Sequence, residues 1–146
     1  MIAIGADHAG FELKEEIVKH LEESNIKYKD FGTFNIGSCD YPLIAEAVCE
    51  SIVVGESSKG ILICGTGIGI CIAANKIKNI RAALCVDELS AERARSHNDA
   101  NVLCIGSKFV SAEKAKKMIN IFLNTNFEGG RHARRVDQIT EIENKI

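Results

Sequence analysis

The sequence has no tryptophan, a single proline (Pro42) and no long apolar run. The longest stretch without a charged side chain, residues 60–75, is interrupted by glycines and falls short of the ~20 residues that cross a bilayer. It therefore predicts a buried core element and argues against a membrane-spanning protein. A formal net charge of −2 argues against nucleic acid or an anionic membrane surface as the main partner.

The six cysteines show no C-x-x-C pair and no other spacing typical of a zinc site. Cys85 and Cys104 stand in apolar runs, where a thiol behaves as a small hydrophobic side chain. The opening MIAIGADHAG lacks the basic start and small-residue cleavage site of a secretory signal. We therefore expect reduced thiols and a cytoplasmic location.

Apolar segments and amphipathic segments alternate five times along the chain. The expected strands are residues 1–5, 27–32, 60–64, 81–86 and 101–106. The expected helices cover residues 13–21, 44–52 and 68–76, and two more begin near Asp87 or Ser90 and at Ser111. Short links and continuously apolar strands predict parallel strands with helices on both faces. We expect one domain over residues 1–146, a three-layer α/β/α Rossmann-like fold with a five-stranded parallel sheet. The polar tail from Glu128 is expected to form a helix that packs on another subunit.

The segment CGTGIG, residues 64–69, follows the third expected strand and opens a helix. Gly65, Gly67 and Gly69 allow backbone N–H groups to point into a cavity, and the helix adds its positive end. Such a turn suits a phosphate or a developing enolate oxygen. It matches neither the G-K-[ST] ending of a nucleotide-binding loop nor the G-x-G-x-x-G dinucleotide pattern. The alternative is a tight strand-to-helix turn without a ligand.

Cys64 stands at the same helix start, where the helix dipole favours a thiolate. It is a candidate base or nucleophile, and the alternative is a buried cysteine at a strand end. Asp7 and His8 follow the first strand between small residues, where they could bind hydroxyl groups or move protons. The alternative for this pair is an ordinary surface turn.

Two further polar clusters lie near strand ends. His97 and Asn98 belong to the segment SHND before the fifth strand, and the tail carries a basic cluster of Arg131, His132, Arg134 and Arg135. Guanidinium forks match phosphate, so a small phosphate suits the tail better than nucleic acid, although a solvated surface is the alternative. Because ligands bind at the carboxyl ends of parallel strands, we expect the segments GADHAG, SCDYP, CGTGIG and SHND to meet there.

Seven segments in the same order resemble the ribose-5-phosphate isomerase type B family, which includes galactose-6-phosphate isomerase subunits and allose-6-phosphate isomerase. They are GADHAGFELK, DFGT, DYP, CGTGIGICIAANK, RAAL, SHNDANVLCIG and FEGGRHARRV. The resemblance implies an aldose–ketose isomerase that opens the sugar ring and passes through an enediolate. It also implies a small phosphorylated sugar as substrate, no cofactor or metal, and active sites shared between subunits of a homodimer or tetramer.

The resemblance also assigns roles. It implies that Cys64 moves a proton between C1 and C2 and that His97 opens the ring, with Asp7 and Tyr41 nearby. Thr66 would pass protons to the substrate hydroxyls. The enediolate would be held by the amides of Gly65, Thr66, Gly67, Ile68 and Gly69.

The phosphate and sugar contacts implied by the resemblance are His8, Arg131, Arg135 and Asn98. Family members often carry arginine where this chain has Lys108, which keeps the charge but not the bidentate fork. Some relatives use a glutamate just after the glycine turn as the base. Here that region reads Ile70, Cys71, Ile72, so only the cysteine mechanism is open to this chain.

Three alternatives to a ribose 5-phosphate isomerase stay open at this point. An isomerase of allose or galactose 6-phosphate would differ in relative kcat/KM on five- and six-carbon substrates. A non-catalytic sugar-phosphate sensor could keep the arginines and glycines, yet it would have no need of Cys64 or His97. A nucleotide-binding module would bind ATP or NAD tightly, which the missing fingerprints disfavour.

Overall fold

Strands and helices alternate along residues 1–145, the part of the chain that the structure, a computed structural model, describes. The strands are β1 (Ile2–Ala6), β2 (Tyr28–Asp30), β3 (Lys59–Cys64), β4 (Ala82–Leu84) and β5 (Val102–Gly106). The helices are α1 (Phe11–Glu23), α2 (Tyr41–Val53), α3 (Ile68–Ala74), α4 (Glu88–Ser96), α5 (Ala112–Asn124) and α6 (Arg131–Asn144). None of the helices within residues 1–145 combines the length and apolar character needed to cross a membrane.

The five strands form one parallel sheet in the order β2-β1-β3-β5-β4. This confirms the predicted parallel sheet, but continuous burial holds only for the three central strands β1, β3 and β5. The edge strands β2 and β4 are short and partly exposed, and β2 carries the charged residues Lys29 and Asp30. An edge strand has a neighbour on one side only, so solvent reaches side chains that a central position would exclude.

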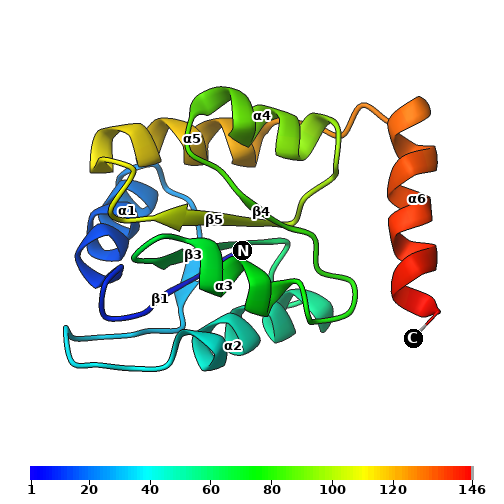
Figure 1. The fold of residues 1–146 in the computed structure, drawn as a ribbon. Coiled ribbons are helices and arrows are strands. Elements are labelled where there is room, and N and C mark those ends of the chain that lie inside the picture. Colours follow the sequence, from blue (N-terminus) through cyan, green and yellow to red (C-terminus); the bar gives the residue numbers. More distant parts are fainter. Residues whose placement is uncertain (146) are drawn as a thin grey trace.

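Helices cover both faces of the sheet, as predicted. Figure 1 shows α1, α4 and α5 on one side and α2 and α3 on the other. Successive residues of β3 alternate between these two layers: Ile61 and Ile63 join the first core, while Leu62 and Cys64 join the second. The last residue of β3 therefore points its side chain toward the α2–α3 layer.

The C-terminal helix α6 lies apart from both layers, after an extended segment (Figure 1). Its buried residues are His132 and Val136. Near its far end Glu143 accepts a hydrogen bond from the Asn79 amide at 3.0 Å. The predicted helical tail is confirmed, and its packing on another subunit stays a prediction.

A fully buried lysine connects α1 to the end of β2. The side chain of Lys14 has no solvent exposure, and its Nζ lies 2.5 Å from Asp30 Oδ2 and 3.0 Å from Glu15 Oε1. The same ammonium lies 5.3 Å from the centre of the Phe34 ring. Because a buried charge is costly without a partner, Asp30 is essential to this arrangement.

Candidate active site

The loops that follow β1, β3 and β5 meet at the carboxyl edge of the sheet. β1 and β3 are neighbours, and the chain leaves β1 for the outer strand β2 before it returns, so the strand order reverses here, at the position where open parallel sheets bind ligands. Ser107 joins the three loops: its amide donates to Cys64 O at 2.9 Å and its hydroxyl donates to Ala9 O at 2.9 Å. The predicted convergence is therefore confirmed for the segments around residues 7 and 64.

Cys64 ends β3 and lies directly beside the glycine turn. Its side chain is almost buried, at 5% exposure, and its Sγ accepts a hydrogen bond from the Gly67 amide at 3.1 Å. Gly67 has a left-handed φ of 78°, and a Cβ at this position would lie 2.9 Å from the backbone nitrogen of Gly106. Only glycine adopts this φ readily and also leaves room for the Gly106 backbone. The turn thus brings a backbone donor to the sulfur at the start of α3.

Other predicted site residues surround the same turn. Thr66 Oγ1 accepts the amide hydrogen of the first α3 residue at 3.2 Å. The ring of Tyr41 lies against Gly69, where an added Cβ would come within 2.6 Å of the ring Cζ. Lys108 donates its amide hydrogen to Gly65 O at 2.9 Å, and its exposed side chain runs past the same glycine. A hydroxyl, a phenol and a lysine side chain therefore border the glycine turn.

Asp7 and His8 lie at this edge, but Asp7 also has a structural role. The buried Asp7 carboxylate accepts hydrogen bonds from the amides of Ala9 and Gly10, each at 3.0 Å, and so shapes the turn into α1. His8 is exposed, and its Nδ1 accepts from the Cys39 amide at 3.2 Å, which fixes the β2–α2 loop beside it. The turn alternative for Asp7 is confirmed, and its role in the site stays a prediction.

His97 and Asn98 lie at the opposite edge of the sheet, where β5 begins. Helix α4 returns the chain from the carboxyl end of β4 to the amino end of β5. The stretch of β3 that pairs with β5 runs from Gly60 to Cys64, and the four steps between these residues rise about 13 Å. The expectation that this segment meets the other clusters at the carboxyl edge is therefore wrong for a single chain, and its meeting them across a subunit interface stays a prediction. The segment SHND precedes its strand, and residues before a parallel strand lie at the amino edge.

The neighbouring Asp99 is structural. It has a left-handed φ of 49°, and its carboxylate accepts hydrogen bonds from Arg95 at 2.8 Å and from Arg81 at 3.1 Å. These two arginines hold the turn that follows His97. The i,i+4 spacing of Arg95 and Asp99 was the available signal in the sequence.

His97 belongs to a cluster with His132 and Glu128 that sequence reasoning did not identify. The two imidazole rings are stacked, with centroids 4.1 Å apart and planes 14° apart. The Glu128 carboxylate reaches 3.8 Å from Nε2 of each ring, beyond hydrogen-bond distance. The pKa of His132 is lowered, mainly by burial. The neighbouring His97 and then Arg131 contribute in the same direction.

A metal ion is a poor match for this cluster as it stands. The donor atoms of His97, Glu128 and His132 all lie within 4.8 Å of one another. However, stacked and nearly parallel rings direct their nitrogen lone pairs side by side, whereas a bound ion needs them to converge.

Arg131 and Arg135 lie next to this cluster on α6. Both are exposed and stand four residues apart, so they share one side of the helix. The predicted phosphate ligands are thus divided: His8 lies at the carboxyl edge of the sheet, whereas the two arginines lie beside His97.

Three further thiols, Cys49, Cys85 and Cys104, lie in the core. All six cysteines are free. Burial raises the pKa of Cys49 to about 12 and that of Cys85 to about 11. The pKa of Cys104 is also raised, first by its contact with Cys71 and then by burial. These protonated side chains serve as small apolar groups, as predicted for Cys85 and Cys104.

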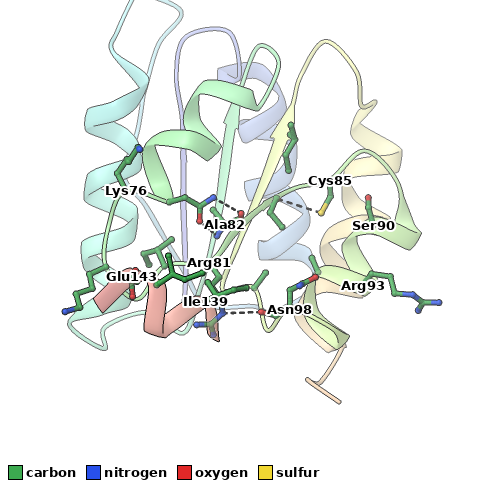
Figure 2. A pocket seen from close by; sticks show the side chains of 17 residues that line it. Lys76, Arg81, Ala82, Cys85, Ser90, Arg93, Asn98, Ile139 and Glu143 are labelled. Carbon is green, nitrogen blue, oxygen red and sulfur yellow. Dashed lines mark hydrogen bonds between the residues drawn. The ribbon is translucent and has the colours of Figure 1, made fainter. Parts of the chain in front are cut away.

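A groove of about 950 Å³ separates α6 from the edge strand β4. Figure 2 shows Ile139 and Glu143 of α6 facing Arg81 and Asn98 across it. Leu84 also lines the groove and is 39% exposed. Neither the thiol nor the glycine turn borders this groove.

The chain is similar to known sugar-phosphate isomerases over almost its entire length. The family model described as Ribose/Galactose Isomerase matches residues 2–139. Ribose-5-phosphate isomerase B of Escherichia coli is 49% identical over 144 residues, which cover 99% of this chain and 97% of that protein. A probable ribose-5-phosphate isomerase B of Mycoplasma pneumoniae is 47% identical over 143 residues, which cover 97% of this chain and 94% of that protein.

Solved structures of such isomerases share the fold. Ribose-5-phosphate isomerase B of Clostridium thermocellum superposes with a TM-score of 0.97 at 46% identity, covering 99% of this chain and 97% of that chain. Ribose-5-phosphate isomerase B of Mycoplasma genitalium, solved with bound ribulose-5-phosphate, has a TM-score of 0.94 at 44% identity. The match covers 99% of this chain and 97% of that chain.

Proposed function

The chain belongs to the ribose/galactose isomerase family, and on that premise we propose that it interconverts D-ribose 5-phosphate and D-ribulose 5-phosphate. The enzyme is an aldose–ketose isomerase. The observation that carries the proposal is the Cys64 sulfur, which accepts the Gly67 amide at 3.1 Å inside a glycine turn at the ligand-binding edge of the sheet. A close relative that holds ribulose-5-phosphate supports the choice of substrate.

The chemistry follows from where charge appears. His97 transfers a proton at the ring oxygen to open the furanose, as the family resemblance implies. The Cys64 sulfur then takes the proton from C2, and the C–H electron pair forms the C1–C2 double bond while negative charge moves to the carbonyl oxygen. Amides of the glycine turn stabilise that oxygen, and Thr66 passes protons between the two oxygens. Cys64 returns its proton to C1, which completes the ketose.

We infer that the site is built from two copies of the chain. His97 and Asn98 precede β5, whose first residue lies about 13 Å along the sheet from the level of the thiol, too far to act on one small sugar. Arg131 and Arg135 flank His132, whose ring stacks on His97. We propose a homodimer in which one protomer supplies the thiol half and its partner the His97 half, while α6 packs on the partner. Exposed apolar side chains on α3, β4 and its following loop, α4 and α6 support such an interface: Ile68, Ile72, Leu84, Val86, Leu89, Ile139 and Ile142.

The proposal extends to the domain organisation and the location of the protein. The whole chain acts as one isomerase domain, since the family model spans residues 2–139. We place the protein in the cytoplasm because six free thiols suit a reducing compartment.

The decisive variant is Cys64→Ala, with Cys39→Ala as the matched control at a half-buried thiol near the same edge. Without its base, the Cys64 variant should lose about 1,000-fold or more in kcat, since proton transfer by a positioned group contributes 10²–10⁴-fold. Circular dichroism should show both variants folded. Full activity of Cys64→Ala, or a higher kcat/KM of the parent on allose 6-phosphate than on ribose 5-phosphate, would contradict the proposal.

Subunit mixing tests the shared site. Cys64→Ala and an Arg131→Ala/Arg135→Ala variant should each be inactive alone. After co-refolding at equal amounts, half of the dimers are mixed and each has one intact site, so about a quarter of the parent activity should return. A site built within one chain predicts no recovery.

A further inference from the structure

In the chemistry above His97 moves a proton, but the imidazole of His132 that stacks on it has no role. His97 is the C-cap of α4 and is about one-third exposed at its side chain. Its ring lies 4.1 Å from the ring of His132, which is only 8% exposed. A catalytic side chain at a helix end thus lies against a buried flat surface provided by another element.

The backbone holds these two rings together. The Glu128 amide donates to Ser96 O at 3.0 Å, directly before His97 in the chain. Gly129 and Gly130 then turn with positive φ of 71° and 57°, and α6 begins with His132 in its first turn. The turn therefore anchors α6 to the end of α4 at the point where the rings meet.

Burial and the neighbouring charges favour the neutral form of the supporting ring. Burial and the adjacent His97 lower the pKa of His132, with Arg131 and Arg135 acting in the same direction and Glu128 opposing them. A neutral His132 ring can lie against the ring of His97 without charge repulsion. Glu128, 3.8 Å from the His97 Nε2, provides the nearby negative charge.

We propose that His132 is a positioning residue for ring opening: its buried ring supports the imidazole of His97 in the orientation that reaches the sugar ring oxygen. The inference rests on the proposed function, in which His97 opens the furanose. Without the support, His97 can rotate about its side-chain bonds at an exposed helix end, and proton transfer to the ring oxygen slows. The proton transfer at Cys64 does not involve this pair.

The test compares a cyclic substrate with one that has no ring to open. In 4-deoxyribose 5-phosphate the hydroxyl that closes the furanose is missing, so the molecule stays open-chain. His132→Ala should lower kcat/KM for ribose 5-phosphate about tenfold, the scale of a catalytic group displaced by a fraction of an ångström, and keep the value for the analogue within about twofold. His132→Phe retains a flat ring and should recover most of the loss.

Controls separate positioning from folding and from metal binding. Gln138→Ala, at an exposed position of α6, should leave both values unchanged. Melting temperatures verify folding, and a chelator in every assay removes ions from the His97, Glu128 and His132 donors. Equal losses on both substrates, or no loss on ribose 5-phosphate, overturn the proposal. A parent protein that converts neither substrate contradicts the proposed function instead.

Discussion

Replacing Gly106 with alanine tests how closely the catalytic turn depends on the neighbouring strand. Gly106 ends β5 and pairs with Cys64 at the end of β3. A Cβ at Gly106 would lie 2.4 Å from Thr66 O and 2.5 Å from Thr66 C, both backbone atoms of the glycine turn. Backbone atoms cannot rotate away as a flexible side chain can, so one of the two segments must move.

The size of the movement sets the expected effect. Ordinary contact begins near 3.4 Å, so the turn and the strand must separate by about 1 Å. Overpacking of a well-packed site costs about 1–3 kcal/mol, and a clash with backbone belongs at the upper end, about 3 kcal/mol. For a chain of this size that lowers Tm by roughly 6–12 °C. A 1 Å displacement of catalytic groups lowers kcat/KM about 100-fold.

Gly55→Ala is the matched control. Gly55 is exposed, has a φ of 84°, and an added Cβ would meet no atom within 4 Å. Backbone strain alone should cost about 1 kcal/mol and leave kcat/KM for ribose 5-phosphate unchanged. Scanning calorimetry and steady-state kinetics on both variants check the result. A Gly106→Ala protein with parental kcat/KM would refute the claim that the turn is held in place by this close contact.

Two other predictions concern buried groups. Lys14→Met leaves Asp30 without its partner and should lower the free energy of unfolding by about 3 kcal/mol in urea. The double variant Lys14→Met/Asp30→Asn should recover part of that loss. A double variant whose loss equals the sum of the losses of Lys14→Met and Asp30→Asn would contradict the pairing. In the folded protein at pH 8, iodoacetamide should spare Cys49 and Cys85, because pKa values of about 12 and about 11 leave both protonated. Their thiolate fraction rises with pH, so mass spectrometry should find labelling only after unfolding or well above pH 8, while the half-buried Cys39 serves as a reactive reference.

The alternation of strands and helices was readable from the sequence because it depends on local patterns. The apolar run before Cys64 predicted β3, the glycines after it predicted the turn, and Pro42 suited the first turn of α2, where it is found. The convergence of Cys64 and Asp7 also followed, because Cys64 is the last residue of one parallel strand and Asp7 directly follows its neighbour. The same rule, applied strictly, places His97 before its strand and hence at the other edge.

Contacts between segments far apart in the chain required the tertiary structure. No sequence pattern states that the Gly106 Cα faces the Thr66 backbone, that Lys14 is fully buried against Asp30, or that His132 stacks on His97. These depend on the strand order β2-β1-β3-β5-β4 and on the path of α6, which result from packing of whole layers. The sequence by itself determined which chemical groups are present and which local element carries each of them. The tertiary structure decided which groups meet, because distances across a sheet are set by the crossovers between strands and have no counterpart in residue spacing.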